Sequence, residues 1–182
     1  GEFQHDGVAW LADSSGLVTS AQRHATWDRD LAQDLYRVGL DGEVTALTAQ
    51  SGWYRQPAVS PDGTLVALLG FDDPTEYPQN VRVGVLPLAG GDITWISTGL
   101  DRTFQPTAGE RAPVWLDSDR LVASAEDRGE THVYELHVDG TTPVALTSGA
   151  ITVTDFDAAG GTIATARGAV DHPAELWLDR GG

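Results

Sequence analysis

The amino-acid sequence predicts an all-β fold, a partial β-propeller of about four blades with four antiparallel strands each, the last blade being incomplete. Three observations lead to this prediction. Short apolar runs are joined by tight turns, this pattern recurs four times within 182 residues, and a second hairpin follows each first one. Four strands in roughly 40 to 50 residues is the spacing of a propeller blade.

The clearest copy of the pattern is residues 58–70. Two apolar runs, Ala58-Val59 and 65–69, flank the turn Ser60-Pro61-Asp62-Gly63. Proline presets φ for such a turn, and glycine supplies the positive φ that it requires. The segment is therefore predicted to be a β-hairpin.

Three further segments repeat this pattern, the last of them more weakly: 9–19, 114–123 and 155–164. If Leu17, Leu65, Leu121 and Ile163 are taken as equivalent, successive copies are 48, 56 and 42 residues apart. Spacing of this kind indicates one structural unit per copy, as in repeat architectures.

A second predicted hairpin follows the first in each copy. Its turns are Asp41-Gly42, Gly90-Gly91 and Asp139-Gly140, which join 35–38 to 44–47, 83–86 to 93–96 and 133–136 to 144–146. In the fourth copy, residues 175–178 open this hairpin and its last strand is lacking. Residues 27–38 also have apolar positions at helical spacing, but the repeat favours a loop over 28–30 and then a strand.

These copies divide the chain into repeats of roughly 4–50, 51–101, 102–149 and 150–182. Residues 1–3 (Gly-Glu-Phe) have the composition of a cloning scar, and we expect the chain to be an excised piece of a longer protein. Propellers typically need four to eight blades to close. An incomplete one exposes sheet faces and strand edges, so we expect the isolated chain to self-associate.

The composition excludes several classes of partner and site. The chain has 27 acidic and 11 basic residues, a formal net charge of −16 and no Cys. Nucleic acid and anionic membranes bind through cationic side chains, so we expect neither as a partner. Without Cys there is no disulfide, thiolate nucleophile or cysteine zinc site. No apolar run approaches the roughly 18 residues of a membrane span.

No catalytic or metal-binding motif is recognised, and we expect no cofactor or metal. The Gly-x-Ser-x-Gly nucleophile elbow is absent from the sequence. The histidines are scattered, and His132 and His137 would point to opposite faces of one strand, which favours ordinary surface histidines. Turn chemistry accounts for the close carboxylate pairs at 117/119 and 155/157. An acid/base pair from the loops of different blades, as in a propeller glycosidase, remains a distant alternative.

Five residues are candidates for substrate recognition. They are Trp53, beside Tyr54 and Arg55 in the connection between two repeats; Glu76 and Tyr77, in the loop between two strands; and Arg102 and Arg111, in the polar entry to the third repeat. The arginines could hold a peptide carboxylate. The other candidate aromatic residues, Trp10, Trp115 and Trp177, are expected to pack between blades.

The repeated hairpin with Ser60-Pro61-Asp62-Gly63, the Asp-Leu-Tyr strand at 34–36 and the Leu-Thr ends at 47–48 and 146–147 resemble the propeller of the prolyl oligopeptidase family of serine peptidases. The third repeat is similar to the acylaminoacyl-peptidase-like branch, over 101–115 and 125–134. The resemblance covers essentially the whole chain after Phe3. TolB-like propellers share the Ser-Pro-Asp-Gly repeat, which leaves a protein-binding scaffold as the alternative.

The resemblance implies a propeller of seven or eight blades over an α/β-hydrolase domain, which would be this chain's partner in the parent and would admit only short peptides. Residues 174–177 resemble the blade just before that hydrolase. No residue of the family's Ser-Asp-His triad can be carried over to this sequence, so we expect no peptidase activity from the chain itself. The family and the lack of Cys together indicate a cytoplasmic bacterial protein.

Overall fold

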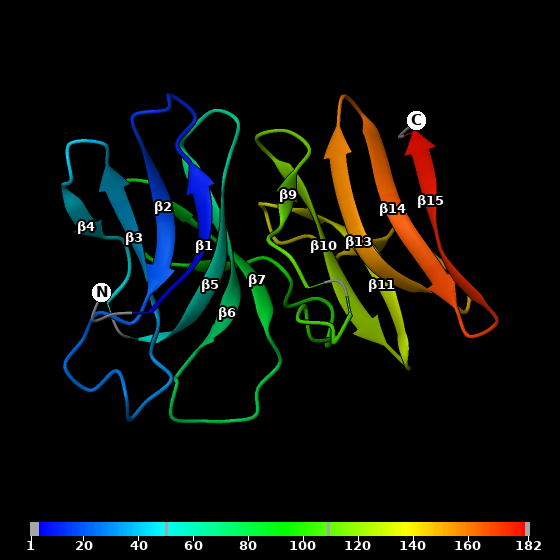
Figure 1. The fold of residues 1–182 in the computed structure, drawn as a ribbon, viewed down its shortest axis with the longest axis horizontal. Coiled ribbons are helices and arrows are strands. Elements are labelled where there is room, and N and C mark those ends of the chain that lie inside the picture. Colours follow the sequence, from blue (N-terminus) through cyan, green and yellow to red (C-terminus); the bar gives the residue numbers. More distant parts are fainter. Residues whose placement is uncertain (1–3, 50, 109, 181–182) are drawn as a thin grey trace.

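The computed structural model describes residues 4–49, 51–108 and 110–180, and the predicted cloning scar at residues 1–3 lies outside them. The described part contains fifteen β-strands and no helix, which confirms the all-β prediction. It therefore has no helix that could cross a membrane. The sheets follow one another across the molecule in chain order, from the N-terminal sheet to β15 (Figure 1).

The first sheet has the order β1-β2-β3-β4 and is antiparallel throughout. Its strands are β1 (His5–Trp10), β2 (Gly16–Ala21), β3 (Asp34–Gly39) and β4 (Val44–Ala46). Residues 22–33 connect β2 to β3 as a loop, so the helical spacing around Leu31 does not produce a helix. The Asp41-Gly42 turn lies where it was predicted, between β3 and β4, with Gly42 at a φ of 89°.

The second sheet repeats this order, β5-β6-β7-β8. Its strands are β5 (Gly52–Val59), β6 (Leu65–Asp72), β7 (Arg82–Pro87) and β8 (Thr94–Trp95). The Ser60–Gly63 turn has the predicted chemistry: Ser60 Oγ donates to Asp62 Oδ1 at 2.6 Å and accepts from the Leu65 amide at 3.0 Å. Gly63 adopts a φ of 72°, which few other residues tolerate.

The remaining strands form the third and fourth copies of the pattern. They are β9 (Val114–Trp115), β10 (Arg120–Asp127), β11 (Glu130–His137) and β12 (Val144–Ala145), then β13 (Thr152–Ala159), β14 (Thr162–Ala169) and β15 (His172–Arg180). Within each group neighbours are antiparallel, and a single parallel pair, Thr131 with Thr152, links β11 to β13. That link joins the seven strands into one hydrogen-bonded sheet.

The same parallel link recurs between successive sheets. Gln33, just before β3, bridges to Trp53 on β5, with Tyr54 N donating to Gln33 O at 2.9 Å. Likewise the amide of Phe104 donates to the carbonyl of Val81, just before β7, at 2.8 Å. In every case the start of a third strand contacts the chain entering the next sheet, so backbone hydrogen bonds fix how neighbouring sheets meet.

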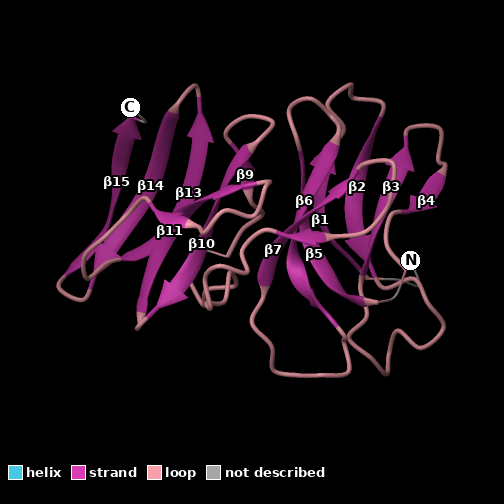
Figure 2. Cartoon of the chain, turned by 180° about the vertical axis from the view of Figure 1, so that it is seen from behind, coloured by secondary structure: helices cyan, strands magenta, loops and turns pink. Residues whose placement is uncertain are grey.

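Apolar side chains fill the three spaces between successive sheets. One cluster includes Val18 and Leu35 from the first sheet with Val66 and Leu68 from the second. A larger cluster lies between the second and third sheets, and a smaller one around Phe156 lies between the β9–β12 group and the β13–β15 group. Figure 2 shows the same succession from behind. This face-to-face packing of four-stranded sheets is the arrangement of propeller blades.

The structure corrects one detail of the predicted repeat. Leu121 and Ile163 each face the preceding sheet, and the residue that does so in the second sheet is Val66 rather than Leu65. Val66 also pairs with Val59 as Leu121 pairs with Trp115. A shift of one residue moves a side chain to the other face of a strand, so only packing could settle this alignment.

The sheets do not close into a ring, and the outer faces at both ends are uncovered. On the first sheet Val8 and Trp10 are exposed, Trp10 to 61%. On the last strand Leu176 and Leu178 are exposed, and β15 is an edge strand. Trp10 lies on the uncovered outer face of the first sheet, and Trp177 is half exposed on the edge strand, on the same face as Thr165, so their predicted packing between blades stays a prediction. Trp115 does contact its neighbour: its Nε1 donates to Ala58 O at 2.9 Å.

Candidate functional site

The long connections of the first three copies gather at one end of the sheets. They are residues 22–33 between β2 and β3, residues 73–81 between β6 and β7, and residues 96–113 between β8 and β9. We call this end the loop face. In Figure 1 it is the lower side, where the first two of these loops project well beyond the strands. In the first two sheets, the opposite end carries the short turns that join strands one and two and strands three and four.

The loop face holds a pocket of about 390 Å³. Its lining, which we call the loop-face pocket, consists of Leu31, Trp53, Phe71, Tyr77, Gln79, Val81 and Gln105. All three long connections contribute to this set. None of the seven side chains carries a charge at neutral pH, although the chain as a whole has a net charge of −16. Pockets of this size and apolar character are typical of small-molecule or side-chain binding sites.

Trp53 and Phe71 form the floor of the pocket. Their rings stack with centroids 5.2 Å apart and an interplanar angle of 29°. Phe71 and Val81 are almost completely buried, whereas Tyr77 at the rim is 75% exposed. The pocket thus has a fixed apolar base and an aromatic side chain that is free to contact a ligand.

Asp30 organises the loop that carries Leu31. Its Oδ1 accepts from His24 Nε2 at 2.7 Å and from the Ala32 amide at 3.0 Å, while Oδ2 accepts from Thr26 Oγ1 at 2.7 Å. The Thr26 hydroxyl, followed by the other donors, lowers the pKa of Asp30, which keeps the carboxylate ionised. The loop is therefore held by side-chain hydrogen bonds on either side of Leu31.

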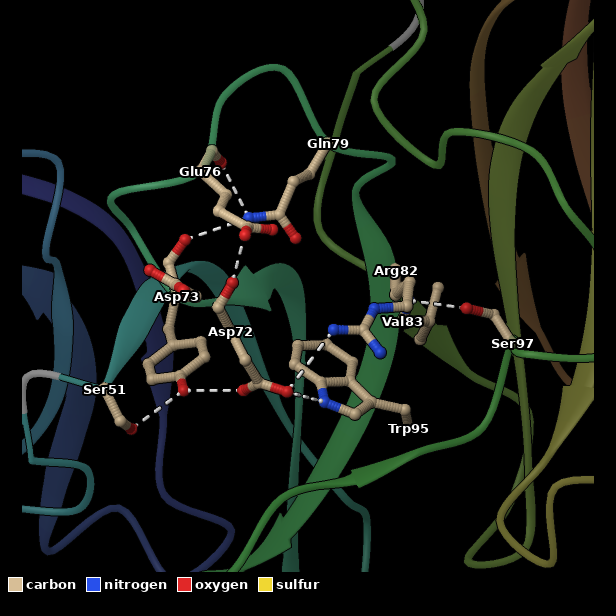
Figure 3. Close-up of polar contacts among 10 residues, drawn as sticks. Ser51, Asp72, Asp73, Glu76, Gln79, Arg82, Val83, Trp95 and Ser97 are labelled. Atoms are coloured by element: carbon tan, nitrogen blue, oxygen red, sulfur yellow. Dashed lines mark hydrogen bonds and ion pairs between the residues drawn. The ribbon is translucent and has the colours of Figure 1, made fainter.

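Gln79 organises the loop that carries Tyr77. Its Nε2 donates to the carbonyl oxygens of Asp72, Asp73 and Glu76, at 3.0, 2.9 and 2.7 Å (Figure 3). A single amide thus closes the loop back onto the end of β6. Because Nε2 is committed to these carbonyls, only the Oε1 atom of Gln79 is left to accept a hydrogen bond from a ligand.

The carboxylate of Asp72 anchors the base of the same loop. It accepts hydrogen bonds from Tyr54 on β5, Arg82 on β7 and Trp95 on β8. Figure 3 shows the contacts with Arg82 and Trp95. A larger hollow of about 640 Å³ adjoins this group near β4 and β8. There the carboxylate is already occupied by three donors of the protein, so its role is structural.

Arg55 connects the pocket to the innermost strands. Its guanidinium lies 5.0 Å from the centroid of the Trp53 ring, a cation–π contact. It also pairs with Asp6 on β1 at 2.7 Å and with Glu110, in the connection to β9, at 3.4 Å. Gln105 Nε2 donates to Glu110 at 3.3 Å, which extends the network to the pocket wall. These contacts hold Trp53 between elements of three sheets.

The structure brings together two of the five residues predicted for substrate recognition. Trp53 and Tyr77 line the loop-face pocket, and Glu76 precedes Tyr77 on the same loop without lining the pocket. Arg102 and Arg111 lie apart from it. Arg102 Nε donates to Asp127 at 2.6 Å, and Arg111 pairs with Asp155 at 3.1 Å and also donates to the Phe156 carbonyl.

Sequence reasoning missed several residues of the pocket, above all Leu31, Phe71, Gln79 and Gln105. Leu31 was noticed only for its helical spacing, and Phe71 ends a strand as an ordinary core residue would. For Leu31 and Gln79 the available signal was their place in the connections between strands two and three, which the repeat puts at one end of adjacent blades. Gln105 lies instead in the connection between β8 and β9.

The histidines and carboxylate pairs need one correction each. His24 and His132 are buried, contrary to the expectation of surface histidines, and they contact Asp30 and Thr147. Asp155 lies within β13 rather than in a turn. Its Oδ1 accepts from the nearby Phe156 amide at 2.9 Å, as expected, and it also pairs with Arg111 of the third copy. Among the described residues, no group of three or more His, Cys, Asp or Glu could hold a metal ion.

Comparison with known proteins finds similarity at the level of the fold. No family model matches the chain, and no curated protein matches it. The chain resembles the β-propeller domain of the Trilobed protease from Pyrococcus furiosus, whose topology is an open velcro, with a TM-score of 0.72 and 14% identity over 100% of this chain and 53% of that one.

Two other solved structures are similar to the same degree. Pyrococcus horikoshii acylaminoacyl peptidase matches with a TM-score of 0.72 and 17% identity, over 100% of this chain and 26% of that chain. TolB from Acinetobacter baumannii matches with a TM-score of 0.70 and 12% identity, over 97% of this chain and 41% of that chain. This chain thus spans about a quarter to a half of the length of these three structures, and its fold is that of a β-propeller.

Proposed function

We propose that this chain is the non-catalytic propeller segment of a serine peptidase of the prolyl oligopeptidase family, close to the acylaminoacyl-peptidase-like branch. In this role it limits access to an α/β-hydrolase domain, encoded outside these residues, to short peptides. The fold similarity to an acylaminoacyl peptidase and to a protease propeller supports the proposal. A bacterial cytoplasmic location goes with it.

The observation that carries the proposal is the loop-face pocket. It lies at the end of the sheets where the three long connections meet. Its lining is uncharged and includes aromatic and amide side chains. Such loops can narrow the path to an active site while a short, flexible peptide still passes. A folded protein domain is too wide for such a passage.

The test uses the natural reading frame that contains these residues. We expect a Gly-x-Ser-x-Gly elbow in an αβ pattern after Gly182, and we expect the full product to cleave short N-acylated peptides while sparing the same sequence within a folded domain. The 182-residue chain itself should not cleave them. The proposal is wrong if no hydrolase pattern follows, or if the full product cleaves both substrates equally.

The second candidate is a TolB-like scaffold that binds proteins and has no attached hydrolase. The similarity to TolB from Acinetobacter baumannii favours it, at nearly the same TM-score as the peptidase. The coding sequence after Gly182 separates the two candidates directly, because only the peptidase requires the nucleophile elbow.

A further inference from the structure

We infer that the loop-face pocket binds a neutral, apolar side chain of a short peptide, so that this propeller selects its ligand by side-chain chemistry as well as by width. The inference rests on the proposed function only in treating that ligand as a substrate. Binding itself is a property of this chain and can be measured on it.

The apolar part of the argument comes from the pocket floor. Trp53 stacks on Phe71, and the buried side chains of Phe71 and Val81 close the base. Leu31 and Tyr77 remain exposed at the rim although both are large and apolar. Covering these two side chains with a ligand would remove apolar surface from water, which is the main source of affinity in such pockets.

The polar part of the argument comes from the two glutamines. Gln79 Nε2 is committed to three backbone carbonyls, and Gln105 Nε2 donates to Glu110. Gln79 is therefore left with its Oε1, an acceptor, whereas Gln105 retains its Oε1 and a second amide N–H. Amide N–H groups of a peptide main chain are the matching donors. A carboxylate would find only neutral donors in this lining, such as the Tyr77 hydroxyl, and no cation to offset its charge.

Charge excludes an ionised ligand as well. None of the described residues that line the pocket is a cation, and Arg55, which stacks on Trp53 beside it, is already paired with Asp6 and Glu110. The chain around it carries 27 acidic residues. The net negative charge of the chain would repel an anionic ligand, and no unpaired cation in the pocket would compensate for this. A cationic ligand would lose its hydration and gain no opposite charge from the uncharged lining. A neutral side chain next to amide N–H groups fits both observations.

The test is a titration of the 182-residue chain with N-acetyl-phenylalaninamide, followed by two-dimensional NMR of backbone and indole N–H signals. We expect saturable shifts at the Trp53 indole and in residues 73–81. Tyr77→Ala and Leu31→Ser should each weaken binding roughly two- to tenfold, the loss expected for one apolar or aromatic contact. Leu40→Ser removes an exposed leucine from the β3–β4 turn, outside the pocket, and should leave binding unchanged.

Two further probes check the chemistry. N-acetyl-phenylalanine with a free carboxylate should bind more weakly than the amide, and N-acetyl-glycinamide, which lacks the side chain, should not produce the Trp53 shift. The inference is overturned if the amide does not bind, if Tyr77→Ala and Leu31→Ser bind it as well as Leu40→Ser does, or if the free acid binds as tightly as the amide.

Failure here and failure of the proposed function can be told apart. If a hydrolase follows in the reading frame but the amide does not bind, the gating role stands and the binding subsite is wrong. If the amide binds in the pocket but no hydrolase follows, the subsite stands on a propeller with another role.

Discussion

The Asp72 carboxylate accepts a hydrogen bond from the Trp95 indole at 2.7 Å, across the width of the second sheet. The same carboxylate accepts from the Tyr54 hydroxyl at 2.9 Å and from Arg82 at 3.3 Å. One side chain at the end of β6 thus joins the other three strands of its sheet. It also fixes the base of the loop that presents Tyr77, which links the stability of this sheet to the shape of the pocket.

Replacing Asp72 should therefore loosen the second sheet. Asp72→Ala removes the acceptor for three donors, and we expect it to lower the free energy of unfolding by about 1–2 kcal/mol, since hydrogen bonds to a charged group contribute strongly and this one is half exposed. Urea denaturation followed by circular dichroism measures the change. Asp92→Ala, an exposed aspartate lining the same hollow, is the control. Equal losses in both variants would contradict the assigned role.

Tyr54 should make stability depend on pH in the alkaline range. Burial raises the pKa of Tyr54 from its ordinary 10 to about 12. Below pH 10 the phenol is protonated whether the chain is folded or unfolded. Its contribution to the free energy of unfolding is then fully present. Between pH 10 and 12 the unfolded chain releases this proton and the folded chain retains it, so the contribution is lost as pH rises.

The measurement is urea unfolding at several pH values from 9 to 12. Tyr54→Phe should show a shallower loss of stability over pH 10–12 than the unchanged protein, because it has no phenol to ionise at that site. Tyr77→Phe, at an exposed tyrosine, should follow the unchanged protein. Parallel curves for the protein and Tyr54→Phe would refute the prediction.

Glycines beneath the aromatic rings of the second sheet should be difficult to replace. A Cβ at Gly84 would lie 2.7 Å from Ile93 Cγ2 and 2.9 Å from the Trp95 ring. We expect Gly84→Ala to cost about 1–3 kcal/mol through overpacking. Gly168→Ala, where the nearest atom would be 3.3 Å away, should cost less. Thermal unfolding of both variants checks this, and the reverse order would contradict it.

We propose that the uncovered sheet faces lead the isolated chain to self-associate. Trp10 on the first sheet and Leu176 on β15 lie on opposite ends of the molecule, so contact between them would be head-to-tail. Light scattering across a concentration series should show the average mass rising with concentration. Trp10→Arg and Leu176→Arg should each reduce this rise, and Leu40→Arg should not. A monomer at every concentration would refute the proposal.

The strands and turns were predictable because their signals are local. The Ser60–Gly63 turn requires particular residues within four positions, and the Asp-Gly turns require a positive φ at one glycine. Repetition then decided the ambiguous cases, above all residues 28–38, where helical spacing around Leu31 competed with the strand that the other copies contain.

The pocket was only partly predictable. Trp53 and Tyr77 were found because each is an aromatic residue in a polar connection, a placement that a core does not explain. Arg102 and Arg111 were chosen as loop cations that could hold a peptide carboxylate. Their partners Asp127 and Asp155 are distant in sequence, so no local pattern could show that these charges are already paired. The contributions of Phe71 and Gln105 depend on three loops meeting, which the sequence does not encode locally.

The sequence by itself determined the all-β repeat, the turn positions and the acidic surface, because each depends on residue type and on spacing within a few positions. Tertiary structure alone decided which face of each strand is buried, how parallel backbone links such as Thr131 with Thr152 join successive sheets, and where an uncharged pocket forms. The physical reason is that these features depend on contacts between residues far apart in the chain, and a register change of one residue reverses which side chains meet.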